Sequence, residues 1–153
     1  MRRSTKHVYA VLSDGELNEG STWEAVMFAA HHRLNNLTIF IDNNGLQGLG
    51  ETKDILDLGD ISRKFADFGW DVITVERGND PDAIVNSSRR ESFGGRPRAL
   101  ICKTVKGSGV RFMEGKYQWH YLPLSEDDYI SAVNDLRNRY EEGILSVARN
   151  NDS

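Results

Sequence analysis

The sequence predicts an α/β domain in which a parallel sheet carries helices on both faces. Short apolar segments alternate with helical periods along the chain, which is the order typical of such a sheet. The 153 residues include 39% hydrophobic and 27% charged residues, an ordinary composition for a soluble domain. A chain of about 150 residues buries enough surface for one core. We therefore expect a single domain over residues 1–147, followed by a frayed tail at 148–153.

Four segments have the composition of strands, and each is bounded by residues typical of turns. The second of them is almost continuously apolar, as expected for a strand that is buried on both faces. The expected strands cover residues 7–12, 37–41, 70–75 and 98–104.

The first expected helix covers residues 21–34, where apolar residues recur at spacings of four, three and four, as on one helix face. Ser21 or Thr22 can cap its start, and Glu24 can form a capping box with Ser21. The apolar residues are Trp23, Met27, Ala30 and Leu34.

Three further helices are expected at 60–68, 80–90 and 125–144. Asp60 or Ser62 can start the first of these, and Ser125 caps the last, whose acidic first turn suits the helix dipole. The segments at 46–58 and 105–123 contain scattered glycines and charges, and both are expected to be irregular loops.

Composition excludes several classes of partner. The formal charge of −4, with no basic cluster, argues against sequence-independent binding of nucleic acid. No apolar stretch approaches the ~20 residues of a membrane-spanning helix, and we expect no secretory signal. The single Cys102 cannot form an internal disulfide, which fits a cytoplasmic protein, and its apolar neighbours predict a buried side chain.

Polar side chains follow three of the expected strands, at the edge where parallel α/β sheets bind ligands. Asp14 follows the first strand, residues 42–44 (Asp-Asn-Asn) follow the second, and Lys106 with Gly107 follows the fourth. Asp14 and Asn44 are thirty residues apart, one strand-helix-strand unit, so both should reach the same edge. Their oxygens suit a hard cation such as Mg²⁺. From the pattern alone, a purely structural role in turns and caps is equally favoured.

The amino-acid sequences of these segments favour one family. Ser-Asp-Gly-Glu-Leu-Asn-Glu-Gly-Ser-Thr-Trp-Glu-Ala at 13–25, followed by Asn-Leu-Thr-Ile-Phe-Ile-Asp-Asn-Asn-Gly-Leu-Gln at 36–47, resembles the thiamine diphosphate motif of transketolases. That motif begins Gly-Asp-Gly and ends in paired Asn. Ser13 stands in place of its first Gly, which extended backbone tolerates. Further matches lie at 64–75, 103–110, 112–115 and 119–120.

The likeness is closest to the N-terminal subunit of transketolases that are split into two chains, and it implies particular site residues. The side chains of Asp14 and Asn44, with the carbonyl of Leu46, would hold Mg²⁺, or Ca²⁺ or Mn²⁺, against the cofactor diphosphate. Gly15 would let the backbone approach that diphosphate. The resemblance also assigns two protonic groups, which are Glu19 in a network at the subunit interface and His120 beside cofactor or substrate.

By this resemblance, residues 1–147 form part of a diphosphate-binding domain. The implied activity is transfer of a two-carbon ketol unit between sugar phosphates or related small molecules. It would require a complementary subunit that carries the pyrimidine-binding domain, in a hetero-oligomer or dimer. Two alternatives remain at this point. One is a related thiamine diphosphate enzyme that decarboxylates or ligates 2-oxo acids, and the other is a structural remnant without catalysis.

Overall fold

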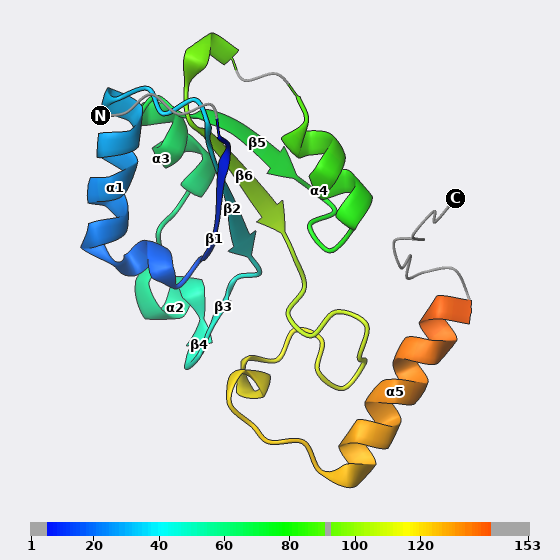
Figure 1. Cartoon of the computed structure of the whole chain (residues 1–153). Coiled ribbons are helices and arrows are strands. Elements are labelled where there is room, and N and C mark those ends of the chain that lie inside the picture. The colour runs from blue at the N-terminus through cyan, green and yellow to red at the C-terminus, as the bar shows by residue number, and fades with distance from the viewer. Residues whose placement is uncertain (1–5, 91–92, 142–153) are drawn as a thin grey trace, which may run out of the picture.

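Four parallel strands form the central sheet of the structure, a computed structural model that describes residues 6–90 and 93–141 (Figure 1). Their order across the sheet is β1-β2-β6-β5. All three pairings are parallel, so the carboxyl ends of the strands meet at one edge. The predicted fold class is confirmed. The strands are β1 (Val8–Ser13), β2 (Leu37–Asn43), β5 (Asp71–Val75) and β6 (Arg98–Lys103).

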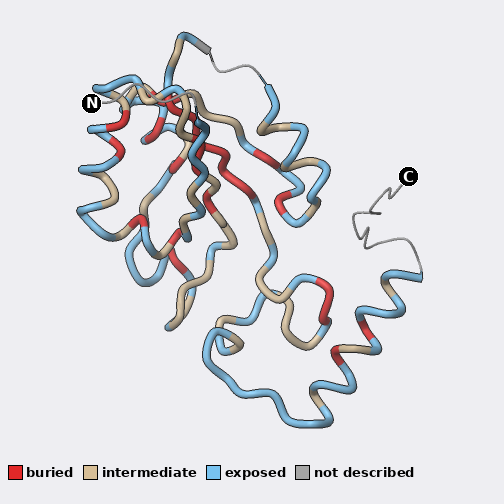
Figure 2. The backbone as a smooth tube through the Cα atoms, viewed as in Figure 1, coloured by how far each residue is buried: buried red, intermediate tan, exposed pale blue. Residues whose placement is uncertain are grey.

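Helices cover this sheet on both faces (Figure 1). α1 (Gly20–His31) and α3 (Ile61–Asp67) pack on one face, where the larger core cluster includes Phe65 and Trp70. α4 (Pro81–Ser88) packs on the other, against a smaller cluster that contains the buried Cys102. The predicted burial of Cys102 is confirmed. Burial raises the pKa of its thiol, and a raised pKa disfavours the reactive thiolate. Figure 2 shows the buried residues concentrated on the central strands.

The start and the buried face of α1 differ from the prediction. Glu19, rather than Ser21 or Thr22, is the N-cap, and no side chain caps the helix there. Val26 and Ala29 are its buried residues, whereas Met27 is about half exposed. Periodicity placed Met27 on the apolar face, but the buried arc is centred on Val26 and leaves Met27 at its margin.

α1 ends at His31, three residues before the predicted end, because the chain closes a Schellman motif. Arg33 takes a left-handed φ of 49°. Leu34 N–H then donates to the carbonyl of Ala29, and Arg33 N–H to that of Ala30, both at 3.1 Å. These are the two bonds that define the motif.

Residues 46–58, expected to be an irregular loop, contain regular structure. β3 (Leu46–Gln47) pairs antiparallel with β4 (Gly50–Glu51), and α2 (Thr52–Leu56) follows. Thr52 N–H closes the hairpin on the carbonyl of Gly45 at 2.8 Å. Strands of two residues are too short to show a period in the sequence, and for this reason the prediction was wrong.

The C-terminal helix α5 (Glu126–Glu141) lies apart from the sheet at the end of a long loop (Figure 1). Two ion pairs attach it to that loop. Arg111 binds Asp135 with N–H and Nε at 2.9 and 2.8 Å, and Arg139 lies 2.8 Å from Glu114. The predicted cap is confirmed, because Ser125 Oγ accepts the Asp128 N–H at 3.1 Å. The predicted end near residue 144 and the tail at 148–153 lie outside the described residues.

No helix in residues 6–90 or 93–141 is long and apolar enough to cross a membrane. Three short 3₁₀ turns complete the secondary structure of these residues. Asp60, one of the two starts predicted for α3, caps that helix with its carboxylate, and Asp80 caps α4 in the same way. The 3₁₀ turns are η1 (Glu16–Asn18), η2 (Phe93–Gly95) and η3 (Tyr117–His120).

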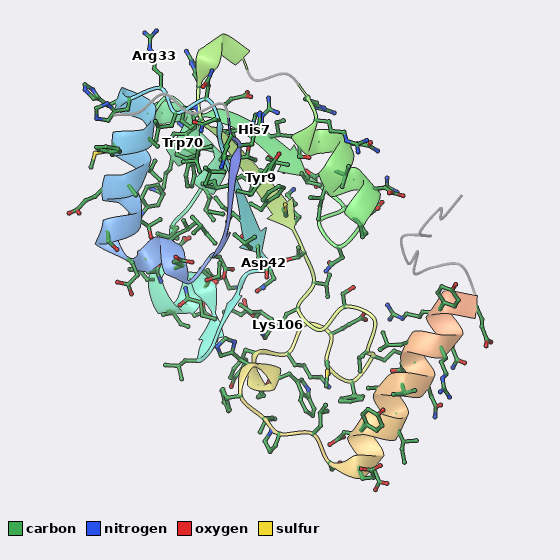
Figure 3. The ribbon with its side chains drawn as sticks, in the orientation of Figure 1. His7, Tyr9, Arg33, Asp42, Trp70 and Lys106 are labelled. Atoms are coloured by element: carbon green, nitrogen blue, oxygen red, sulfur yellow. The ribbon has the colours of Figure 1, made fainter. Side chains whose placement is uncertain are left out.

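β1 forms one edge of the sheet and leaves apolar side chains uncovered. Tyr9 is 63% exposed and Val11 is 74% exposed. Figure 3 shows Tyr9 on this outer strand and His7 just before it, and their rings stack with centroids 6.3 Å apart. Both faces of β1 are apolar in sequence, as in an interior strand, although β1 has one neighbour among the described strands.

A buried arginine joins β6 to β5, the strand at the sheet edge opposite β1. Arg98, 4% exposed, donates from Nε and Nη2 to one carboxylate oxygen of Asp71, at 3.0 and 2.8 Å. Its Nη1 also donates to the main-chain carbonyls of Ser88 and Arg90. The side chain thus joins β5 and β6 to the end of α4.

We predict that Arg98→Met lowers the free energy of unfolding by about 3 kcal/mol, because it removes the buried guanidinium that pairs with Asp71 and donates to two main-chain carbonyls. Arg63→Met is the matched control. Its pair with Asp67 is long, at 3.8 Å, and exposed on both sides, so the loss should stay below about 0.5 kcal/mol. Urea unfolding measures both, and equal effects would contradict the assigned role of Arg98.

Attachment of α5 should weaken in acid. The hydrogen bond from Arg111 lowers the pKa of Asp135 below 3.8, and that from Arg139 lowers the pKa of Glu114 below 4.5. A lowered pKa in the folded state gives stability that is present at neutral pH and is lost as pH falls through the lowered value. Asp135→Asn should therefore reduce the thermal midpoint at pH 7 and have a smaller effect at pH 3. Circular dichroism measures both midpoints, and a pH-independent difference would refute the assignment.

Candidate functional site

Asp14 is the centre of the candidate site, at the carboxyl end of β1. Its side chain is buried, with the residue 1% exposed. Oδ1 accepts the N–H of Gly15 at 2.9 Å, while Oδ2 accepts the N–H of Gly45 at 2.9 Å and the hydroxyl of Thr52 at 3.0 Å. Burial raises the pKa of Asp14, and the three hydrogen bonds oppose that effect. One carboxylate thus joins the end of β1 to the hairpin and to α2.

Asn44 directly follows the neighbouring strand β2 and is fixed by contacts to both ends of its side-chain amide. Its Oδ1 accepts the N–H of Leu46 at 2.9 Å, and its Nδ2 donates to Asp42 Oδ2 at 3.3 Å. Asp42 is itself held by the hydroxyl of Thr104. Gly45, at a φ of 73°, turns the chain so that the residue after Asn44 binds Asp14. The structure therefore holds Asp14 against the turn that contains Asn44 and Leu46, at the edge of the sheet where the spacing of Asp14 and Asn44 placed both.

The acceptor atoms of this turn suit a hard cation. Among the described residues, Asp14 Oδ1 and Asn44 Oδ1 each accept one hydrogen bond, which leaves a lone pair on each oxygen. A carboxylate, an amide and a main-chain carbonyl form an all-oxygen set of the kind that Mg²⁺ binds together with phosphate and water. The described residues contain no group of three or more His, Cys, Asp or Glu that could hold a metal. Ligand phosphates would have to complete the coordination.

Gly15 lies against the hairpin, in a position where a side chain would crowd its neighbour. A Cβ at Gly15 would be 3.3 Å from Gln47 Cγ, closer than ordinary contacts. Its φ of −66° suits any residue, so close approach, not backbone conformation, is the reason for glycine here. Gln47 Nε2 is buried and has no hydrogen-bond partner in the described structure. This free donor next to Gly15 fits an anionic group, and the sequence pattern gave no sign of it.

His120 reaches the same edge from η3. Its ring packs on the hairpin, because a Cβ at Gly48 would be 3.3 Å from His120 Cδ2. Lys106 Nζ lies 3.4 Å from His120 Nδ1. Lys106 also lines a polar cleft of about 440 Å³ together with Asn44. Figure 3 shows Lys106 beyond the end of β2, on the side where Asp42 lies.

Glu19 lies outside the group of residues around Asp14, and Ser13 differs from the glycine of the family motif. Glu19 is exposed at the start of α1, so its assignment to a subunit interface stays a prediction. Ser13 ends β1 in extended backbone, and its Oγ accepts the N–H of Glu16 at 3.1 Å. The hydroxyl thereby supports η1, and serine is accommodated where the motif has glycine.

Fold and site together define an α/β domain whose candidate site lies beyond the carboxyl ends of parallel strands, where such domains bind ligands. Residues 1–142 match the family described as transketolase, thiamine diphosphate binding domain. The chain belongs to this family of transferases.

Several named proteins are similar in sequence. One of the subunits of apulose-4-phosphate transketolase from Actinobacillus succinogenes is 38% identical over 134 residues, which are 88% of this chain and 48% of that protein. A 6-deoxy-6-sulfo-D-fructose transketolase subunit of a Clostridium species is 37% identical, over 84% of this chain and 47% of that protein. Human transketolase is 36% identical, over 82% of this chain and 20% of the human protein. The chain thus spans about half the length of the subunit relatives.

Solved structures agree with this assignment. Transketolase from Campylobacter jejuni superposes with a TM-score of 0.79 at 25% identity, covering 86% of this chain and 21% of that one. Transketolase from Pichia stipitis in complex with sedoheptulose-7-phosphate has a TM-score of 0.76 at 26% identity, covering 86% and 19%.

Proposed function

We propose that this chain contributes the metal and diphosphate site of a transketolase that transfers a two-carbon ketol unit between sugar phosphates. The proposal rests on the turn after β2, in which the Gly45 N–H binds Asp14 next to Asn44. The Oδ1 atoms of Asp14 and Asn44 each keep one acceptor position. The relatives named above as transketolase subunits, with a sugar phosphate or a sulfo sugar in their names, support this class of substrate.

In the proposed site, Asp14 Oδ1, Asn44 Oδ1 and the carbonyl of Leu46 hold Mg²⁺. The metal offsets diphosphate charge, and Ca²⁺ or Mn²⁺ could replace it because both take oxygen ligands. Gly15 admits the diphosphate close to the backbone, where Gln47 Nε2 offers a hydrogen bond. Bound thiamine diphosphate supplies the ylid that makes ketol transfer possible.

Lys106, which lines the cleft beside Asn44, takes the electrostatic role, and His120, which contacts Lys106, takes the protonic role. The Lys106 ammonium attracts phosphate oxygens, and it can donate to Nδ1 of His120. An imidazole that accepts at Nδ1 carries its proton on Nε2. That proton can pass to a substrate oxygen while Nδ1 takes up a proton from the Lys106 ammonium, so that the ring stays neutral, and the two transfers reverse later. We assign His120 as the catalytic proton carrier on this basis.

The proposed enzyme requires a second chain. Relatives that match over about half their length are named as transketolase subunits, which supports a complementary chain. We propose that this partner supplies the pyrimidine-binding domain, in a hetero-oligomer or dimer, and that Glu19 lies at the contact between the two chains. Residues 1–147 then form part of the diphosphate-binding domain.

Native mass spectrometry of the tagged chain, purified from its own host, tests the proposal. We expect a complex with a partner chain that retains thiamine diphosphate and Mg²⁺. Asp14→Asn should lose both ligands because it removes the charge that binds the metal, whereas the exposed control Asp67→Asn should keep them. A lone chain would refute the proposed partner, and wild-type and Asp14→Asn complexes with equal cofactor content would refute the metal site.

His120→Ala should lower kcat by about 100-fold or more, the usual contribution of a proton carrier, with little change in cofactor content. The change removes the imidazole and leaves the metal turn intact. Steady-state ketol transfer by the purified complex gives kcat and KM. His31→Ala, at the exposed end of α1, is the control. Normal turnover in His120→Ala would return His120 to a packing role on Gly48.

A further inference from the structure

Thr52 is the one side chain in the described structure that hydrogen-bonds to Asp14 directly. The other two donors are main-chain N–H groups of Gly15 and Gly45. Thr52 is the first residue of α2, is 9% exposed, and donates from Oγ1 to Asp14 Oδ2 at 3.0 Å in a buried contact. It lies 38 residues from Asp14 in the sequence. The contact therefore depends on the folded hairpin.

The hydroxyl decides which oxygen of the carboxylate remains available. With the Thr52 hydroxyl and the Gly45 N–H, Oδ2 accepts two hydrogen bonds, the usual capacity of such an oxygen. Oδ1 accepts only the Gly15 N–H and keeps a lone pair. Without the hydroxyl, the two oxygens would accept one main-chain bond each, and nothing in the hydrogen bonding would distinguish them. Thr52 makes the carboxylate asymmetric.

Thr52 also shields the carboxylate. It lines, together with Gly45, the wall of an adjacent cavity of about 610 Å³ at the carboxyl ends of the strands. The position of Thr52 does not depend on its hydroxyl, because its main-chain N–H is bonded to the carbonyl of Gly45 at 2.8 Å. A change confined to the hydroxyl should therefore leave the hairpin in place.

We infer that Thr52 is a positioning residue for metal binding: its hydroxyl holds Asp14 so that Oδ1 faces the cation. The inference rests on the proposed role of Asp14 as a metal ligand. Hydrogen-bond donors behind a ligand carboxylate fix its orientation and affect metal affinity by about 10-fold to 100-fold.

Thr52→Val and Thr52→Ser test this inference in the intact complex, with Mn²⁺ and thiamine diphosphate as probes. Valine keeps the shape of threonine and removes the hydroxyl, while serine keeps the hydroxyl. The Kd of Mn²⁺, measured by electron paramagnetic resonance, should rise about 10-fold or more in Thr52→Val and stay near wild type in Thr52→Ser. Circular dichroism should show the same fold in both variants.

The outcomes separate this inference from the proposed function. Unchanged Mn²⁺ affinity in Thr52→Val, with affinity lost in Asp14→Asn, would overturn the role of Thr52 and keep the metal site. Equal losses in Thr52→Val and Thr52→Ser would show that packing, rather than the hydroxyl, is responsible, and would also overturn it. Equal affinity in wild type and Asp14→Asn would refute the metal site itself.

Discussion

Burial of one carboxylate organises the functional edge of this domain. Asp14 directly follows β1, yet its hydrogen bonds reach the turn after β2 and the start of α2. An ionised group in this position would be costly without partners, and burial raises the pKa of Asp14 despite three hydrogen bonds. A bound cation would favour the charged form. The same contacts that fold the turn around Asp14 therefore prepare a site whose charge a metal can balance.

The sheet and the outline of this site could be predicted because both depend on local patterns. Apolar runs mark the four strands, and polar residues directly after two of them place Asp14 and Asn44 at one edge. Gln47 and Thr52 could not be found in this way. Their roles come from contacts with Gly15 and Asp14, which are distant in the sequence and meet only when the hairpin forms. The chemistry of His120 is similarly set by Lys106, through a contact between two loops.

Two kinds of attachment hold the peripheral elements. α4 is joined to the sheet by apolar packing and by the buried guanidinium of Arg98. α5 depends instead on Arg111 and Arg139, with most of its surface exposed (Figure 2). Both pairs of α5 have a more exposed cation than the Arg98 pair, and exposed charges are screened by salt more than buried ones. The attachment of α5 should therefore weaken more with rising ionic strength than the attachment of α4.

The uncovered edge strand has a consequence for how the chain behaves in solution. An outer strand with free N–H and C=O groups is a template to which another strand can add. On β1 this edge also carries the exposed side chains of Tyr9 and Val11, so addition of a strand would bury apolar surface as well as satisfy the backbone. Copies of the domain in which nothing covers the outer edge of β1 are therefore prone to pair through this strand. Their self-association should grow with protein concentration.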